Sequence, residues 1–425
     1  MRAPRVSRHP RRSAVVTATA LAVAAWTVPA AALSQTAPLA PSSPASAPLV
    51  PISPASAPLV PILHAPAVPG TAGRAGAGAA PAEAATGTGT GTVAAGSLDL
   101  VRPSATPVML RNAPRKLSVS YTHAGRKTTL ASFLKRAKAN GFVVLDGRSV
   151  VYERYVAANR DTRFQTWSVA KSFTSAAVGI ALSERHIRSI DDPVTAYLPE
   201  LRGSGYDGVS VRDLLRMSSG IDWDERSDVP RVHVAANRGR PVASIAARQV
   251  RGWKPGSRFA YTSMNSFVLA KLVGRATRTP FHRYVEKKIW QPAGMESTLG
   301  VGNDGNGDNL GYCCFHATDR DLARFGLLYL NGGKAKGRQV VPRSWVEAST
   351  RPSASFNPGY GLHWWLGGDG EGDFMAAGLG GQYIYVSPEH GVVVVISAVS
   401  APPADDRREA LTAFRAVAAE VARTR

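Results

Sequence analysis

The chain has 425 residues and carries 51 lysine and arginine side chains against 30 aspartate and glutamate side chains, a net charge of +21. The basic residues form no stripe interleaved with aromatic residues, so we expect no nucleic-acid binding, although this charge would suit association with an anionic cell envelope. The two cysteines, Cys313 and Cys314, are adjacent. Because neighbouring cysteines rarely meet disulfide geometry, the sequence predicts a fold that does not rely on disulfides.

The N-terminus has the pattern of a secretory signal peptide. Five arginines and no acidic residue precede a short apolar run over 13–28, and the three alanines at 30–32 offer a cleavage site of small residues. The arginine pair at 11–12 is also compatible with twin-arginine export, so the route stays open. We therefore expect 1–32 to be a signal peptide and the protein to be secreted or extracytoplasmic.

A long segment of low complexity follows, over 33–98. It consists mainly of Ala, Pro, Ser, Gly and Thr, and the unit SPASAPLVPI occurs twice in succession, at 43–52 and 53–62. Such a composition cannot bury a core, so we expect a disordered linker. No later stretch is long and apolar enough to span a membrane, and a single globular domain is expected over 99–425.

The first elements of this domain are a helix and a hairpin. We expect the helix over 129–140 and the hairpin from strands 142–145 and 149–156, which flank an Asp-Gly turn. A mostly helical region then begins near Ser168. Further helices are predicted in its second half and beyond, at 267–277, 281–289, 318–329 and 342–348.

Strands return near the C-terminus, at 382–386 and 391–399. The second strand is an almost continuous Val and Ile run, so it should be central and covered on both faces. Asp405 or Asp406 should then cap a closing amphipathic helix. The predicted fold class is α/β (α+β): one antiparallel sheet built from both chain ends, flanked by helices, with a mainly helical lobe inserted.

One short motif indicates nucleophilic chemistry. A helix that begins at Ser168 places Ser168 and Lys171 on one face, three residues apart. A partly desolvated lysine can take the proton of a serine hydroxyl, and a helix N-terminus offers N–H groups to an oxyanion. The same spacing occurs at Ser132 and Lys135, but these lie inside a predicted helix and are interpreted as a surface pair.

Several further segments occur in the same order as in a known protein superfamily. With the motif at Ser168, the chain over about 125–425 resembles the serine β-lactamase and penicillin-recognising superfamily. It is most similar to the class C branch, which includes D-Ala-D-Ala carboxypeptidases, family VIII-type esterases and 6-aminohexanoate-dimer hydrolases. The segments that carry the resemblance are TWSVAKSFTS at 166–175, VRDLLRMSSGI at 211–221, PGSRFAYTSMNSFVLAKLV at 255–273, IWQPAGM at 289–295, ATDRDLARFG at 317–326, YGLHWW at 360–365 and GLGGQ at 378–382.

The resemblance implies roles for particular residues. Ser168 matches the nucleophile and Lys171 the neighbouring base. Tyr261 matches the tyrosine of the family's Tyr-x-Asn motif, which passes a proton to the leaving group. The backbone N–H groups of Ser168 and Gln382 would form the oxyanion hole.

Two positions depart from the family pattern. Ser263 stands where Asn is usual, which removes an amide that would bind the substrate, and Asn265 is near enough to substitute in part. At the Lys-Thr-Gly position the chain has Leu379-Gly380-Gly381, so the lysine that would meet a β-lactam carboxylate is absent. We expect Gly380 and Gly381 to let substrate approach the backbone closely.

Other patterns are interpreted as structural. The glycines at 300–305 match a dinucleotide fingerprint, but no helix is predicted to follow them. The acidic segment 304–308 lacks the ligands of a calcium loop at the required positions, so we expect a solvated loop. The histidines have no ligand spacing, and His363 should pack near the cleft. Three tryptophans could line an acyl pocket or pack in the core: Trp167, Trp223 and Trp364.

The sequence thus predicts an exported serine hydrolase that acts on short esters or small linear amides and needs no metal or cofactor. A D-Ala-D-Ala carboxypeptidase or β-lactamase, acting on cell-wall peptides or β-lactams, is the alternative. A non-catalytic penicillin-recognising envelope protein is a third possibility, which the intact Ser168, Lys171 and Tyr261 disfavour.

Overall fold

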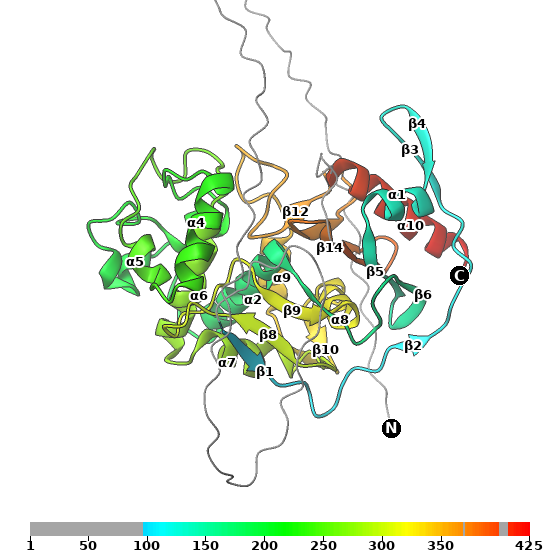
Figure 1. Cartoon of the computed structure of the whole chain (residues 1–425), viewed down its shortest axis with the longest axis horizontal. Helices are drawn as coiled ribbons and strands as arrows, with labels where there is room; N and C mark the ends of the chain where they lie inside the picture. Colours follow the sequence, from blue (N-terminus) through cyan, green and yellow to red (C-terminus); the bar gives the residue numbers. More distant parts are fainter. Residues whose placement is uncertain (1–96, 369, 399–406) are drawn as a thin grey trace, which may run out of the picture. The chain divides into compact units, whose positions relative to one another are not determined.

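The computed structural model describes residues 97–368, 370–398 and 407–425 (Figure 1). The predicted signal peptide, almost all of the predicted linker and the helix cap at Asp405 or Asp406 lie outside these residues. Within the described part of the chain, no helix has the length and apolar character that crossing a bilayer requires.

A seven-stranded sheet forms the centre of the domain. Its spatial order is β12-β13-β14-β15-β5-β6-β2, and all neighbours are antiparallel except β6 and β2. The middle pair joins the two chain ends, with Val394 opposite Val144. This arrangement confirms the prediction of a sheet built from both ends. The strand bounds are Arg111–Asn112 (β2), Ala139–Asp146 (β5), Ser149–Tyr155 (β6), Trp365–Leu366 (β12), Phe374–Gly378 (β13), Gln382–Ser387 (β14) and Val392–Ala398 (β15).

Both faces of this sheet are covered, as the Val and Ile run of β15 predicts. Side chains alternate along a strand, so Val392 and Val394 face one layer while Val393 and Val395 face the other. Helices α1 (Leu130–Arg136) and α10 (Arg407–Arg423) cover the first face (Figure 1). Helix α8 (Asp319–Leu330) covers the second face, and α2 (Ala170–Ser183) packs behind it.

Stacked rings join α2 to α8. The Phe173 and Phe325 centroids are 3.7 Å apart with an interplanar angle of 16°. Both side chains are fully buried. The helix that carries the Ser-x-x-Lys motif is thereby fixed to the layer that supports the sheet.

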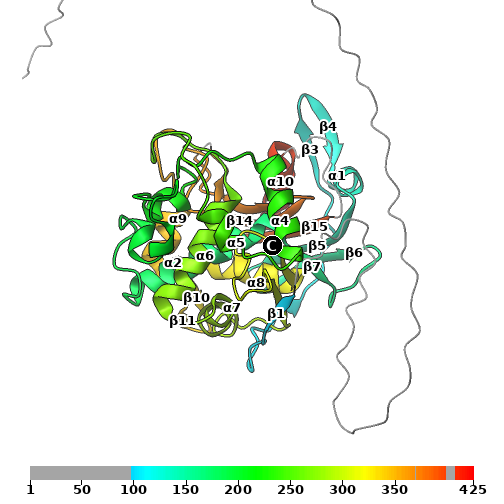
Figure 2. The ribbon, with the colours of Figure 1, turned by 60° about the vertical axis from the view of Figure 1, so that its left-hand side comes forward.

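The remaining elements form a second sheet and a largely helical lobe, which lies at the left of Figure 1 and is turned to the front in Figure 2. The second sheet has four strands in the order β1-β8-β9-β7 and was not predicted. The bounds of these strands are Leu98–Val101 (β1), Arg163–Gln165 (β7), Leu299–Gly302 (β8) and Phe315–Thr318 (β9). The lobe helices are Val211–Leu215 (α3), Glu225–Asn237 (α4), Val242–Ala246 (α5), Ser263–Thr277 (α6) and Phe281–Val285 (α7). A further helix, Arg343–Ser349 (α9), packs on α2.

Two small hairpins and several short helices complete the fold. The hairpins pair Ser120–His123 (β3) with Arg126–Thr129 (β4), and Lys334–Ala335 (β10) with Arg338–Gln339 (β11). Short 3-10 helices cover Trp167–Val169 (η1), Val194–Ala196 (η2) and Pro199–Leu201 (η3). A π-helical turn, η4 (Glu286–Trp290), extends α7.

Several predicted bounds and one loop differ from the structure. Helix α1 is shorter than predicted, because Lys138 adopts a positive φ of 49° and β5 begins at the next residue. The segment 304–308 is not simply solvated. Asp304 is fully buried, and its carboxylate accepts hydrogen bonds from the backbone N–H groups of Asn306, Asp308 and Val242.

The contact between α2 and α9 generates a stability prediction. A Cβ added at Gly179 would lie 2.2 Å from Trp345 Cγ. We expect Gly179→Ala to lower the free energy of unfolding by about 1–3 kcal/mol, because the packed indole must shift. Gly274→Ala is the matched control: its Cβ would meet ordinary contacts of 3.5 Å, and alanine favours a helix by about 1 kcal/mol. Denaturant unfolding of both variants checks this, and equal stabilities would contradict it.

Candidate active site

The Ser168 motif begins with a sharp turn between a strand and a helix. After β7, the 3-10 turn η1 (Trp167–Val169) precedes α2, so the helix starts two residues later than predicted. Trp167 has a positive φ of 48°, which is uncommon outside glycine and is often found at functional sites. This turn leaves Ser168 partly exposed at the N-terminal end of α2.

Lys171 lies buried beside Ser168. Its Nζ donates hydrogen bonds to Ser168 Oγ at 2.8 Å, to Ser263 Oγ at 3.0 Å and to the carbonyl oxygen of Tyr312 at 3.0 Å. Burial lowers the pKa of Lys171 to about 8, and the negative charge of Glu225 acts in the opposite direction. A substantial fraction of the amine is therefore neutral near pH 8 and can accept the serine proton.

Tyr261 faces the same amine from the loop before α6. Lys171 Nζ lies 5.0 Å from the centroid of the Tyr261 ring. The ring stacks on Trp365 at 5.7 Å and meets Tyr360 edge-on at 6.5 Å. The loop is held by the backbone hydrogen bond from Ala260 N–H to the Met217 carbonyl, 2.8 Å long. The three predicted side chains of the catalytic group thus come together.

A carboxylate that the sequence analysis missed completes this cluster. Glu225, the first residue of α4, accepts hydrogen bonds from the Ser263 hydroxyl and from the Ser263 N–H at 2.9 Å. Its other donor is Trp223 Nε1, at 2.6 Å. Glu225 therefore orients Ser263, which in turn contacts Lys171. Nothing in the DWDE stretch at 222–225 marks this residue in advance, because its neighbours are also acidic.

The predicted substrate-binding glycines form the turn between β13 and β14. Gly380 and Gly381 have φ values of 82° and 83°, a backbone conformation that glycine adopts without strain. Gly378 comes close to the nucleophile, since a Cβ there would lie 3.1 Å from Ser168 N. The side chain of Gln382 is buried and donates to the Ala398 carbonyl oxygen.

Asn265 does not have the environment that the sequence analysis expected. It is fully buried on α6, where its Oδ1 accepts a hydrogen bond from Tyr206 OH at 3.1 Å. Its Nδ2 lies 3.9 Å from the Met217 sulfur atom. The amide thus ties α6 to the Tyr206 segment inside the helical lobe, so it is not available to replace the missing amide at Ser263.

The other candidates have structural environments. Ser132 is exposed on α1, where Thr129 caps the helix, as expected for a surface pair. His363 is buried and shares a 2.9 Å hydrogen bond with Ser266 Oγ. Trp364 is fully buried in the main core, while the Trp223 indole is fixed by Glu225.

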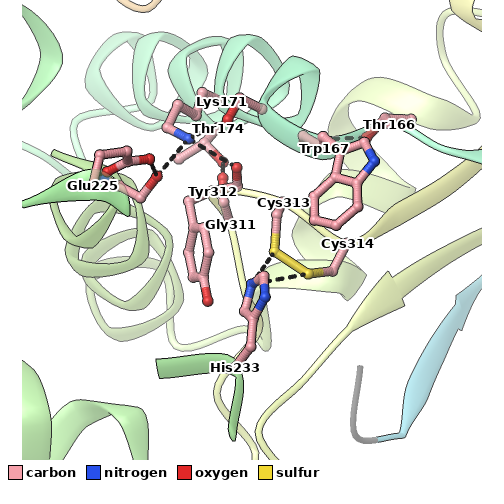
Figure 3. The surroundings of a disulfide bond; sticks show 12 residues. Thr166, Trp167, Lys171, Thr174, Glu225, His233, Gly311, Tyr312, Cys313 and Cys314 are labelled. Atoms are coloured by element: carbon pink, nitrogen blue, oxygen red, sulfur yellow. Dashed lines mark hydrogen bonds between the residues drawn. A yellow bond between two sulfur atoms is a disulfide. The ribbon is translucent and has the colours of Figure 1, made fainter. Parts of the chain in front are cut away.

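The expectation about the cysteines is wrong. Cys313 and Cys314 form a disulfide directly after Tyr312, with Cys314 at a positive φ of 67° (Figure 3). His233 Nε2 lies 3.3 Å from Cys313 Sγ, and its ring stacks on Tyr312 at 5.6 Å. Burial and the nearby Lys171 lower the pKa of His233 to about 4, so this imidazole is neutral at pH 7. No sequence signal predicts this bond, because neighbouring cysteines rarely meet disulfide geometry.

The lowered pKa of Lys171 predicts how the reactivity of Ser168 depends on pH. The neutral amine is the base, so the rate at which a fluorophosphonate labels Ser168 should rise with pH, with its midpoint near pH 8, and level off about one pH unit above that midpoint. Mass spectrometry of the labelled peptide measures this rate. A rate that does not change between pH 6 and pH 9 would contradict the role of Lys171.

Glu225→Gln tests the missed carboxylate. Removal of the negative charge that raises the pKa of Lys171 should move the midpoint of this pH profile to lower pH. The loss of orientation at Ser263 should also lower the plateau rate about tenfold. Glu347→Gln, on the surface of α9, is the matched control and should leave the profile unchanged. An unmoved or raised midpoint in Glu225→Gln would show that Glu225 does not act on Lys171.

Comparisons with known proteins identify the family of this chain. Residues 127–419 match the family described as Beta-lactamase. The 6-aminohexanoate-dimer hydrolase of Paenarthrobacter ureafaciens is 32% identical over 299 residues, which cover 64% of this chain and 75% of that protein. Among solved structures, a proposed 6-aminohexanoate-dimer hydrolase from Bacillus anthracis has a TM-score of 0.70 at 23% identity, over 76% of this chain and 91% of that chain. A family VIII carboxylesterase has a TM-score of 0.52 at 17% identity, over 67% and 95% of the two chains. The structures support the fold, and the family match with the 32% relative establishes membership: the chain belongs to the beta-lactamase family of serine hydrolases.

Proposed function

We propose that the protein is an exported hydrolase that cleaves carboxylic esters or small linear amides through an acyl-enzyme on Ser168. The observation that carries this proposal is the 2.8 Å hydrogen bond between Lys171 Nζ and Ser168 Oγ, with the same nitrogen anchored on Ser263 and Tyr312. A buried amine held in this position is prepared to accept the serine proton. The export part of the proposal rests on the signal-like pattern at 1–32.

In the acylation step, Ser168 Oγ attacks the carbonyl carbon of the substrate as its proton moves to Lys171. Tyr261, whose ring lies 5.0 Å from the Lys171 nitrogen, passes a proton to the departing alcohol or amine. Collapse of the tetrahedral intermediate breaks the ester or amide bond and leaves the acyl group on Ser168. A water molecule, activated by the same groups, then releases the acid and restores the hydroxyl.

The oxyanion hole needs two backbone donors, of which Ser168 N–H is the first. The close approach of Gly378 to the Ser168 backbone favours the N–H of the next residue, Leu379, as the second donor. Gln382 pairs with Gly378 across the hairpin and so belongs to the neighbouring strand. We therefore propose the N–H of Leu379, instead of that of Gln382, as the second donor of the oxyanion hole. The glycines on either side of Leu379 keep this backbone accessible.

The substrate class follows from what the site contains and lacks. A glycine-rich turn stands where a lysine would meet a β-lactam carboxylate, and Ser263 stands where an amide side chain is usual. The relative at 32% identity is a 6-aminohexanoate-dimer hydrolase, which supports linear amides as the substrate class of this protein. A family VIII carboxylesterase shares the fold. These features favour esters and linear amides over β-lactams.

A substrate panel tests the proposal. The full chain should hydrolyse p-nitrophenyl butyrate or a linear 6-aminohexanoate dimer faster than nitrocefin or a D-Ala-D-Ala peptide. Ser168→Ala should lower this turnover at least about 10³-fold, because it removes the nucleophile. Ser132→Ala is the matched control, since it alters the exposed serine of the other Ser-x-x-Lys pair, and it should retain full turnover.

Two results would refute the proposal. Nitrocefin or D-Ala-D-Ala turnover without ester or amide turnover would assign the site to β-lactams or cell-wall peptides. Turnover that survives in Ser168→Ala would show that another residue is the nucleophile.

A further inference from the structure

Three side chains with metal-ligand chemistry meet next to the candidate active site. His233 comes from α4, and Cys313 and Cys314 precede β9. His233 Nε2 lies 3.3 Å from the first sulfur atom and 3.9 Å from the second. All three residues are buried, at 5%, 3% and 2% exposure, and their ligand atoms lie within 4.8 Å of one another. Figure 3 shows the imidazole directed at the sulfur pair.

As a disulfide, the two sulfur atoms are bonded to each other and cannot supply thiolate ligands. A small dithiol reductant changes this state by thiol–disulfide exchange. The step breaks the Cys313–Cys314 bond and forms the disulfide of the oxidised reductant, while two electrons and two protons pass to the protein sulfur atoms. Two thiols beside an imidazole are the donor set that thiophilic cations prefer.

We propose that Cys313 and Cys314, once reduced, bind one thiophilic divalent cation such as Zn²⁺ together with His233. Binding releases the two thiol protons, so the charges of the cation and the two thiolates cancel. This balance matters because an uncompensated charge in a buried site is costly. The proposal does not depend on the substrate of the hydrolase.

Tyr312 connects this site to the catalytic lysine. Its carbonyl oxygen accepts a hydrogen bond from Lys171 Nζ, and the next residue is Cys313. Its ring stacks on His233 on one side and lies 5.7 Å from Lys171 Nζ on the other. Coordination of a metal ion rearranges both cysteines and His233, and therefore moves the carbonyl that helps to hold Lys171. We expect reversible inhibition on metal binding.

Cadmium binding to the full chain tests the proposal, because thiolate–cadmium bonds give a charge-transfer absorption in the ultraviolet. The dithiol-treated protein, freed of reductant without oxygen, should bind about one Cd²⁺ per chain. The untreated protein is the internal control and should bind none. An excess of Zn²⁺ should compete with Cd²⁺ for the site, and the rate of fluorophosphonate labelling at Ser168 should fall about tenfold with the ion and recover with a chelator.

Cys314→Ser and His233→Gln separate the ligands. With folding checked by circular dichroism, the first variant should lose the charge-transfer band and the second should bind Cd²⁺ at least about tenfold more weakly. Unchanged Cd²⁺ affinity in His233→Gln would remove the imidazole from the site. The proposal is overturned if the pair stays oxidised in excess dithiol, or if reduced wild-type protein with two titratable thiols binds no Cd²⁺.

Discussion

The burial of one amine organises the candidate active site. Lys171 is a lysine withdrawn from water on the first turn of α2, and its nitrogen meets three oxygen atoms from three separate segments. Withdrawal from water makes the neutral form accessible near pH 8, while the three acceptors fix its position. A solvated lysine would lack both properties. The helices, the loop at 312–314 and the lobe together shield this nitrogen from water.

The segments that shield Lys171 come from distant parts of the sequence, and each packs against a different part of the fold. Helix α2 is anchored through Phe173 to α8, which lies on the main sheet. Ser263 belongs to α6 of the helical lobe and is oriented by Glu225 of α4. The site thus lies where the sheet layers and the lobe meet, which is a common location for ligand sites between two packed units.

Much of the fold could be predicted because it depends on local pattern. The Asp-Gly turn predicted the β5–β6 hairpin, and the unbroken Val and Ile run of β15 predicted a strand covered on both faces. The site was predictable where residues lie in one segment, as Ser168 and Lys171 do. Glu225 was not predicted because its role depends on the tertiary approach of α4 to α6. The expectation for Asn265 was wrong because a small difference in position along a helix determines whether a side chain faces the active site or the core. The disulfide was missed because its formation depends on local backbone geometry, which composition does not encode.

The central pairing of β5 with β15 has a consequence for the order of folding. Residues near 144 and near 394 must find each other across some 250 intervening positions, and both strands lie in the buried centre of the sheet. Contacts of such long range slow folding, because the chain loses entropy before it gains their stabilisation. The sheet cannot close until β15 has been synthesised, whereas α6 and the neighbouring lobe helices are complete much earlier. The nascent chain is therefore expected to hold a collapsed lobe and an open half-sheet, with β5 exposed as an unpaired edge until the last strands arrive.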